Sequence, residues 1–249
     1  MSRSPIHKAL SIFRKHRVRA LLMGGQACIL YGAAEFSRDI DLAVLADEKN
    51  LSRLQATLDE LKAKPVFVPP MSADVLLRGH ACLFRCGMPG TEGLRIDVMS
   101  VLNGCEPFEK LWSRRRTLAL PGAGRINVLS LADLVQAKKT QRDKDWPMVR
   151  RLLEADYHGR SSKPKRARVE LWLRELRTSE ILIEICRKYA RTARALVKVR
   201  PALGPAFRGD RGGVERALQT EQDRFRALDR QYWAPLRTEL AEWRRALRK

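Results

Sequence analysis

Apolar residues recur up to about residue 156 with the two periods that distinguish strands from helices. Period-two alternation or short apolar runs predict strands at 19–23, 39–45, 81–85, 94–99, 117–120 and 126–128. Helical spacing and capping residues predict helices at 5–16, 26–33, 47–61, 130–141 and 147–156. Strands that alternate with helices in this way indicate an α/β or α+β domain.

The rest of the chain carries only the helical pattern. Residues 159–165, rich in glycine, serine and lysine, are typical of a linker. Beyond them, apolar residues recur at spacings of three and four, as in Val169, Trp172, Leu173 and Leu176, and in Leu236, Leu240 and Trp243. A segment rich in proline and glycine, 200–213, separates the two helical stretches, and Pro235 is predicted to start or kink the last helix. We therefore expect an α/β or α+β domain at 1–158 and an all-helical domain at 165–249.

The charge of the chain is strongly positive. There are 49 Lys and Arg residues against 28 Asp and Glu, a formal net charge of +21. The excess is spread along the chain, with 24 basic and 15 acidic residues in 1–150 and 25 and 13 in 151–249. Such a surface attracts polyanions, of which nucleic acid is the commonest. The alternative is that arginine-rich helices reflect a genome of high GC content.

The chain shows no membrane or secretory signal. No stretch approaches the roughly 20 apolar residues of a membrane span, and the N-terminus lacks the apolar core of a signal peptide. The five cysteines are irregularly spaced, which predicts free thiols in a reducing cytoplasm. Cys82 and Cys86 with His80 would make half a zinc site, but the alternation of Cys82 with Phe84 favours a strand face.

Asp39 and Asp41 are the strongest chemical signal. On a strand, residues i and i+2 point to the same face, so the two carboxylates lie side by side between apolar neighbours. Their mutual repulsion is relieved by a divalent cation, and Mg²⁺ prefers carboxylate oxygen. A turn residue beside a solvated strand position is the alternative, which the apolar neighbours of Asp41 disfavour. The pair predicts metal-assisted phosphoryl or nucleotidyl transfer.

Asp97 on the strand at 94–99 supplies a third carboxylate. If this strand pairs beside that of Asp39 and Asp41, three carboxylates and phosphate oxygens can hold two metals about 3.5–4 Å apart. Asp97 is then the candidate to lie beside an attacking hydroxyl. Taken alone, Asp97 is equally well explained as an aspartate on an edge strand.

Gly24 and Gly25 end the strand at 19–23 and open the next helix. Glycine lets a phosphate approach the backbone, and a helix N-terminus offers free N–H groups. Ser37 and Arg38 lie beside the carboxylates in sequence, and Lys138 lies on the helix at 130–141. These five residues are our candidates for binding a nucleoside triphosphate, although any strand-to-helix turn can use two glycines.

These motifs resemble a known superfamily. Residues 24–27 (GGQA) and 36–42 (FSRDIDL) are similar to the polymerase-β-type nucleotidyltransferases, whose pattern is a G[G/S] turn, a short helix, D-x-[D/E] and a later acidic residue. Within that superfamily the chain looks most like the AbiEii-like toxin nucleotidyltransferases, which carry a later Lys, Arg and Asp motif, here within 133–145 (DLVQAKKTQRDKD). The resemblance covers roughly residues 18–155. Position 25 is Gly where much of the superfamily has Ser.

The resemblance implies an α+β, nucleotidyltransferase-like fold with a mixed sheet flanked by helices, followed by the all-helical module. It also implies Mg²⁺ as cofactor and an NTP as substrate. It implies that Lys138 contacts the nucleotide, with support from Arg142 and from Asp143 or Asp145, although Asp145 could equally cap the helix near Pro147. It points to RNA, possibly a tRNA 3′ end, as acceptor in a toxin or defence context, with an antitoxin protein as a possible partner. The alternatives are a catalytically quiet module that binds RNA or protein, and transfer onto a protein or a small molecule such as an aminoglycoside.

Overall fold

The chain divides into two compact units. The computed structural model describes residues 4–34, 36–66 and 69–246. The first unit comprises Met1–Leu30, Ala34–Ala137 and Tyr232–Lys249, and the second comprises Tyr31–Ala33 and Lys138–Gln231. These units do not coincide with the predicted domains 1–158 and 165–249, whose outer ends lie partly outside the described residues. The limits of the independently folding domains, 1–158 and 165–249, therefore stay a prediction.

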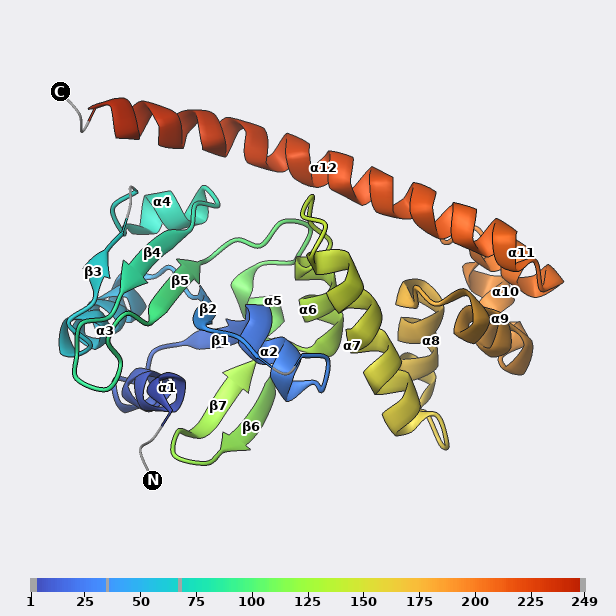
Figure 1. Ribbon diagram of the computed structural model, residues 1–249, viewed down its shortest axis with the longest axis horizontal. Coiled ribbons are helices and arrows are strands. Elements are labelled where there is room, and N and C mark those ends of the chain that lie inside the picture. Colours follow the sequence, from blue (N-terminus) through green and yellow to red (C-terminus); the bar gives the residue numbers. More distant parts are fainter. Residues whose placement is uncertain (1–3, 35, 67–68, 247–249) are drawn as a thin grey trace. The chain divides into compact units, whose positions relative to one another are not determined.

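A seven-stranded mixed sheet forms the centre of the first unit (Figure 1). Its strand order is β3-β4-β5-β2-β1-β7-β6. The strands are β1 (Ala20–Met23), β2 (Asp39–Val44), β3 (Lys64–Pro65), β4 (Cys82–Arg85), β5 (Arg95–Met99), β6 (Arg116–Leu120) and β7 (Gly124–Val128). The pairs β2–β5 and β1–β7 are parallel, and the other neighbours are antiparallel. The predicted α+β class with a mixed sheet flanked by helices is confirmed.

The alternation along β2 and β5 divides the sheet into a core face and a polar face. Ile40 and Leu42 on β2 are buried, as are Ile96 and Val98 on β5, whereas the residues between them are half-buried. Each buried aliphatic side chain contributes about 1.5–3 kcal/mol to folding. This burial fixes the register, because a slip of one residue would turn the apolar side chains away from the core.

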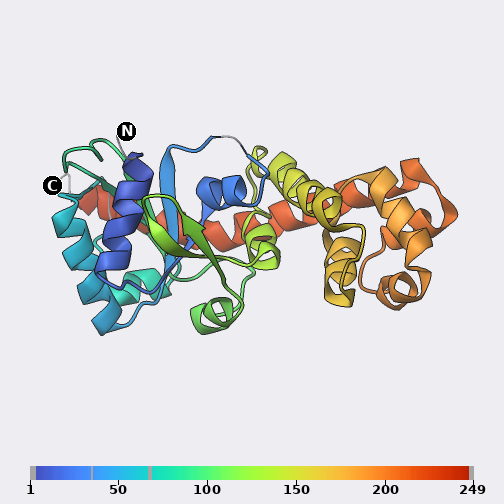
Figure 2. The ribbon, with the colours of Figure 1, turned by 90° about the horizontal axis from the view of Figure 1, so that it is seen from below.

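Helices surround the sheet in the first unit. They are α1 (Pro5–Lys15), α2 (Gly24–Leu30), α3 (Glu48–Glu60), α4 (Ala73–Leu77), α5 (Phe108–Ser113) and α6 (Leu131–Ala137). Helix α1 packs against α3 and β7, as Figures 1 and 2 show, and α2 packs against β1 and β2. The side chain of Asp47 accepts from the N–H of Asn50, which confirms its predicted role as the N-cap of α3. Sequence patterns missed β3, α4 and α5, which are too short to show a period.

The second unit is all helical, as predicted for the C-terminal module. Its helices are α7 (Asp145–Arg160), α8 (Arg166–Glu175), α9 (Ser179–Lys188), α10 (Ala190–Leu196), α11 (Leu203–Arg208) and the first part of α12 (Arg211–Ala246). Trp172 is fully buried, and its indole N–H donates to Asp156. Arg200, also buried, donates to the carbonyl oxygens of Leu173 and Leu176, which otherwise lack partners at the end of α8.

Of the two predicted roles of Pro235, to start or to kink the last helix, the first is wrong. Helix α12 begins at Arg211, and Pro235 lies inside it. The two glycines at 212–213 indicated a linker, but the carboxylate of Asp210 accepts from the N–H of Gly213 at 2.8 Å and caps the helix. Local capping therefore outweighs the poor helix propensity of glycine at this position.

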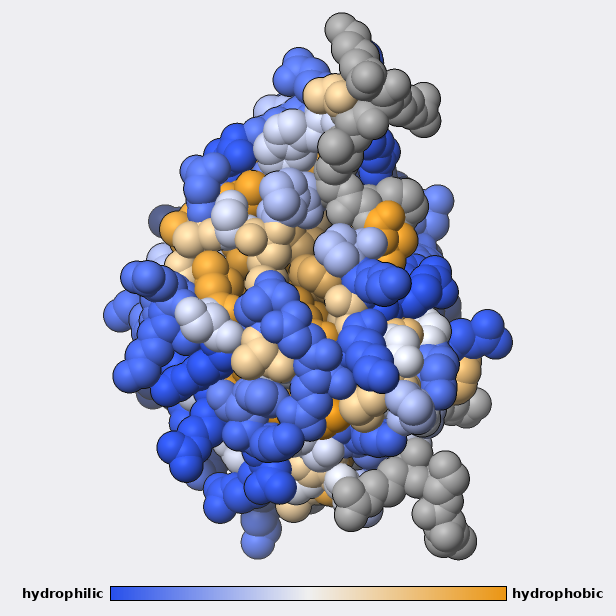
Figure 3. Space-filling view, turned by 90° about the vertical axis from the view of Figure 1, so that its left-hand side faces the viewer, coloured by the Kyte–Doolittle hydropathy of each residue, from blue (hydrophilic) through white to orange (hydrophobic). Residues whose placement is uncertain are grey.

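Most of the surface seen in Figure 3 is hydrophilic, with smaller apolar areas between the charged side chains. None of the described helices combines the length and the apolar composition that crossing a membrane requires. Cys82 is buried in β4, as the strand alternation predicts, and the five cysteines are free thiols.

Candidate active site

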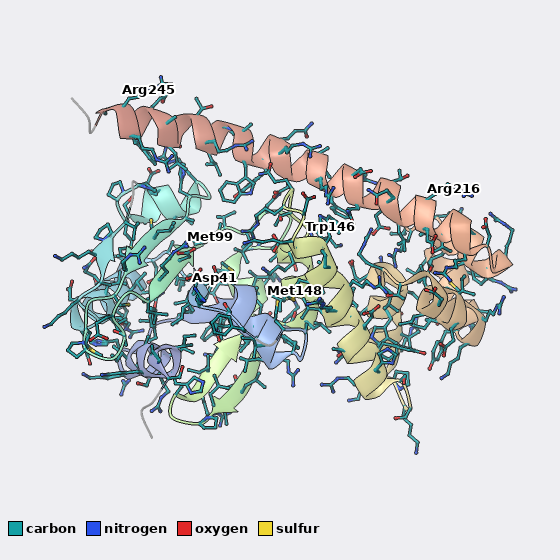
Figure 4. The ribbon with its side chains drawn as sticks, viewed as in Figure 1. Asp41, Met99, Trp146, Met148, Arg216 and Arg245 are labelled. Carbon is teal, nitrogen blue, oxygen red and sulfur yellow. The ribbon has the colours of Figure 1, made fainter. Side chains whose placement is uncertain are left out.

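The parallel pairing of β2 with β5 brings the predicted carboxylates together. Asp41 lies directly opposite Asp97, and Asp39 lies opposite Arg95. Partners in a parallel register share a face of the sheet, so the three aspartates and Arg95 lie on the polar face. Figure 4 labels Asp41 on β2 and Met99 at the end of β5. The first unit therefore contains a compact acidic site with one arginine in it.

Arg95 lies between two of the carboxylates. Its Nη2 is 3.3 Å from Asp97 Oδ2, and its Nη1 is 3.7 Å from Asp39 Oδ2. Both contacts are long for ion pairs, and the side chains of Arg95 and Asp39 are each 38% exposed. The guanidinium thus partly neutralises the acidic face. The sequence placed Arg95 on the face of Asp97 but did not indicate this bridging role.

Asp97 is a carboxyl group of the site with a clearly shifted pKa. Burial raises its pKa to about 6, the negative charges of Asp41 and Asp39 add to the increase, and Arg95 opposes it. Its Oδ1 atom is buried and has no hydrogen-bond partner among the described residues. A buried oxygen without a partner is costly, and in a native site it calls for a ligand or a function.

The glycine turn packs directly against β2. Gly24 has φ +64°, and a Cβ built on it would lie 1.7 Å from Asp41 Oδ2. A Cβ on Gly25 would lie 2.5 Å from the Oγ of Ser37, whose carbonyl accepts from the side chain of Gln26 at 2.9 Å. Glycine is therefore required at position 24 by both conformation and space. The turn thus sets Gly24 against Asp41 and Gly25 against Ser37.

Phe36 and Arg38 form a small exposed element ahead of β2. The guanidinium of Arg38 lies over the ring of Phe36, 5.4 Å from its centroid, and Phe36 is 70% exposed. A cation over an aromatic face is worth about 0.5–1 kcal/mol at an exposed site. Sequence reasoning gave no role to Phe36, although an aromatic residue just before the polar Ser37 and Arg38 is a recognisable signal.

The donor set of the site fits a divalent cation. Three carboxylates, including one buried oxygen without a partner, are the ligands that Mg²⁺ prefers. As the side chains lie, however, no group of three or more His, Cys, Asp or Glu residues in the described parts of the chain is arranged to hold a metal. Arg95 supplies the positive charge between Asp39 and Asp97 instead.

In the second unit, Lys138 and Arg142 converge on Asp145. The Asp145 carboxylate, 3% exposed, accepts from Lys138 Nζ at 3.1 Å, Arg142 Nε at 2.8 Å and Thr140 Oγ1 at 2.6 Å. Burial acts to raise the pKa of Asp145, but Lys138, Thr140 and Arg142 together hold it below its usual value. Asp145 is therefore an ionised anchor for two cations.

Asp143 has a different environment. Its side chain is 91% exposed and pairs with Arg226 at 2.7 Å. The neighbouring Lys139 pairs with Glu175 at 2.7 Å and is buried. Of the two aspartates that the resemblance left open, Asp145 holds Lys138 and Arg142, and Asp143 holds neither.

Two side chains of the arginine run at 114–116 contact other residues of the first unit. Arg114 donates to both carboxylate oxygens of Asp133, at 2.8 and 3.2 Å, and Asp133 in turn accepts from Ser130 at the start of α6. Arg115 lies over the ring of Trp112, 4.2 Å from its centroid. The N–H of Asp133 donates to the Oγ of Ser130, so the two residues cap the start of α6.

Comparisons with known proteins give only distant likenesses. No family model matches the chain, and no curated protein matches it. Among solved structures, the antibiotic-resistance factor ANT(2″)-Ia matches with a TM-score of 0.37 and 13% identity, covering 85% of this chain and 94% of its own. A protein described as a nucleotidyltransferase from H. pylori matches with 0.40 and 12%, covering 90% and 97%, and JHP933 from Helicobacter pylori with 0.38 and 10%, covering 99% and 97%. TM-scores below 0.5 at such identities say nothing about which reaction this chain performs.

Proposed function

We propose that the chain is a Mg²⁺-dependent nucleotidyltransferase, which moves a nucleoside monophosphate from an NTP to an acceptor hydroxyl. The observation that carries the proposal is the register of β2 and β5, which sets Asp41 opposite Asp97 with Asp39 on the same face. Gly24 lies against Asp41, where no other residue fits. The proposal thus places a carboxylate cluster beside a backbone turn open to phosphate.

Each carboxylate has a role that its environment supports. Asp39 and Asp41 would hold Mg²⁺, with Asp97 as a third ligand, and the bound metal would neutralise charge on the triphosphate. Asp97 would accept the proton of the acceptor hydroxyl; burial and the neighbouring carboxylates raise its pKa when no cation is bound, and a bound Mg²⁺ would offset that effect. The acceptor oxygen then forms its bond to the α-phosphorus as the bond to pyrophosphate breaks.

The nucleotide would be held from several elements. Gly24 and Gly25 let the triphosphate approach the backbone, and the Ser37 hydroxyl lies where the side chain of a serine at position 25 would begin. We infer that Ser37 supplies the hydroxyl that Gly25 lacks. Arg38 is exposed beside the site. The sequence resemblance adds Lys138 of the second unit, which pairs with Asp145, as a residue that contacts the nucleotide, and a lysine suits a phosphate as a point charge.

RNA is the acceptor that the charge of the chain favours, since +21 attracts a polyanion. The sequence resemblance to AbiEii-like enzymes favours a tRNA 3′ end, a toxin or defence role and an antitoxin partner. Five free thiols suit a reducing cytoplasm. These finer assignments belong to the proposal together with the reaction.

The test is transfer of label from each α-³²P NTP to total RNA in the presence of Mg²⁺. The wild type should label RNA, and Asp39→Ala with Asp41→Ala should abolish labelling. A matched control removes two exposed carboxylates elsewhere, Asp59→Ala with Asp223→Ala, and should retain it. Labelling that survives the loss of Asp39 and Asp41 would refute the assignment. A parallel reaction with aminoglycosides and with protein acceptors distinguishes the other acceptor classes.

A second candidate is a catalytically quiet module that binds RNA or a protein. The observation that favours it is Arg95, which already supplies a cation between Asp39 and Asp97. Such a module would bind RNA with a steep salt dependence but would use no NTP. Stabilisation of the protein by Mg²⁺, lost in Asp41→Asn, separates the enzyme from this alternative.

A further inference from the structure

An open groove lies between α8 and α10 in the second unit, with a volume of about 490 Å³. These two helices pack directly against one another. The lining residues are Arg166, Glu170, Arg174, Arg191, Thr192, Ala195 and Leu196. None of them belongs to the Asp145 cluster described above.

The positions of the lining residues follow from helix geometry. Arg166, Glu170 and Arg174 are four residues apart on α8, and a spacing of four places side chains on one face of a helix. Arg191 and Ala195 on α10 are related in the same way, and the buried Leu196 closes the floor. The groove therefore has basic side chains on both walls and an apolar base.

The charges in the groove do not cancel. Glu170 pairs with Arg166 at 2.8 Å, so the single acid of the lining is already neutralised. Arg174 and Arg191 are exposed, and neither has an ion pair or hydrogen bond with any described residue. Two guanidinium groups thus face one another across a concave surface without a partner, whereas many arginines of this unit, such as Arg142 and Arg168, are paired.

We propose that this groove binds the phosphodiester backbone of a single-stranded RNA. Guanidinium groups match phosphate oxygens in two-point hydrogen bonds, and a hollow with an apolar floor accommodates sugar carbons. A cavity in the range of about 300–1,000 Å³ holds a small molecule and not a duplex, so one or two nucleotides fit. This inference deepens the proposed function, because it rests on RNA being the acceptor and names the surface that holds it.

The magnitude of the effect follows from counterion release. Each phosphate contact to a single strand contributes about 0.7 to the slope of log K against log salt. Loss of two contacts lowers the slope by about 1.4, which corresponds to roughly 25-fold weaker binding at 0.1 M salt if the electrostatic contribution vanishes near 1 M. At 0.5 M salt the loss shrinks to about 2.6-fold by the same arithmetic.

The experiment measures binding of a fluorescent 12-nucleotide oligouridine RNA by anisotropy, from 0.05 to 0.5 M salt, without NTP or Mg²⁺. Arg174→Gln with Arg191→Gln should lower both affinity and slope as calculated. A matched control with the same change in charge, Arg224→Gln with Arg230→Gln, alters two exposed arginines of α12 that likewise have no ion pair or hydrogen bond with a described residue, and it should leave the slope within about 0.3 of wild type. Arg174→Lys with Arg191→Lys keeps the charge and should retain most of the slope, which separates loss of contact from misfolding.

Each outcome decides the proposal. Equal losses in the groove and control variants would mean that RNA responds to net charge alone, which overturns it, as would no binding by the wild type at 0.05 M salt. The measurement requires no turnover, so it can be repeated in the background of Asp39→Ala with Asp41→Ala. If the groove variant loses RNA affinity but the wild type shows no transferase activity, the groove proposal stands and the proposed enzyme is refuted. Transferase activity that persists without RNA binding would support the enzyme and refute the groove.

Discussion

Asp97→Asn should stabilise the protein at alkaline pH while it abolishes transfer. Burial, Asp41 and Asp39 raise the pKa of Asp97 to about 6, from an unfolded value of about 3.9. The folded state therefore binds this proton more tightly than the unfolded state. The stabilisation is fully present below pH 4 and is lost as the pH rises through 6. Asparagine cannot ionise, so the variant escapes the loss.

The size of the effect follows from linkage. A shift of about two pKa units corresponds to about 3 kcal/mol over the whole titration. Between pH 5 and pH 8, where both proteins can be measured, the same shift changes the stability of the wild type relative to the variant by about 1.4 kcal/mol. For a chain of this length that is a relative change in melting temperature of roughly 3–6 °C.

The assay compares thermal unfolding of wild type and Asp97→Asn at pH 5 and pH 8 in the presence of EDTA. From pH 5 to pH 8, the free energy of unfolding of Asp97→Asn should rise by about 1.4 kcal/mol relative to that of wild type. Asp74→Asn, which changes a carboxylate with a side chain that is 77% exposed, is the control and should show a much smaller change with pH.

Addition of Mg²⁺ at pH 8 should remove this difference in stability between wild type and Asp97→Asn. A ligand at ten times its Kd stabilises the folded state by about 1.4 kcal/mol, and only the wild type retains the third carboxylate to bind it well. A difference between the proteins that does not depend on pH would show that Asp97 is not crowded by the other two aspartates. A variant that is less stable than wild type at pH 8 but not at pH 5 would refute the convergence of the three side chains.

Three further experiments test how the site is built. Gly24→Ala should destabilise the protein by about 1–3 kcal/mol in urea unfolding and should abolish transfer, because its Cβ meets Asp41 at positive φ; an active, stable variant would contradict the close approach. Gly25→Ser should be destabilising alone and should be rescued by Ser37→Gly, with a coupling of about 0.5–3 kcal/mol in a double-mutant cycle; additive effects would show that the two side chains do not compete for space. Asp145→Asn should cost about 3 kcal/mol, because it removes a buried carboxylate that pairs with the partly buried Lys138 and with Arg142, whereas Asp143→Asn should stay within about 0.5 kcal/mol in the same denaturation assay; equal effects would contradict the different environments of the two carboxylates.

The sequence predicted the members of the acidic site but not their alignment. Period-two alternation is a local property, so it assigned Asp39 and Asp41 to one face and gave Asp97 a strand of its own. Whether Asp97 lies opposite Asp41 depends on the parallel register of β2 and β5, a contact between segments more than fifty residues apart in sequence. Alternation indicates that Ile96 and Val98 are buried, which fixes the core face of β5, but it does not reveal which strand β5 pairs with.

The errors have a common physical cause. Elements such as β3, α4 and α5 are shorter than a recognisable period and are held by contacts with the rest of the unit. The start of α12 was misjudged because one capping side chain, Asp210, outweighs two glycines. The choice between Asp143 and Asp145 needed burial and partners, which distinguish residues that look alike in sequence.

The contacts of Arg95 bear on the choice between the proposed enzyme and the catalytically quiet module. Their length and exposure support the enzyme. The Arg95 contacts with Asp97 and Asp39, at 3.3 and 3.7 Å, are long, and more than a third of the arginine side chain meets solvent. Ion pairs of this kind contribute about 0–1 kcal/mol. By contrast, the buried Oδ1 of Asp97 has no partner among the described residues, and its pKa is raised although Arg95 is present. An arginine that took the place of the metal would donate a hydrogen bond to Asp97 Oδ1. Because this oxygen has no such partner among the described residues, the site still favours binding of a more highly charged cation.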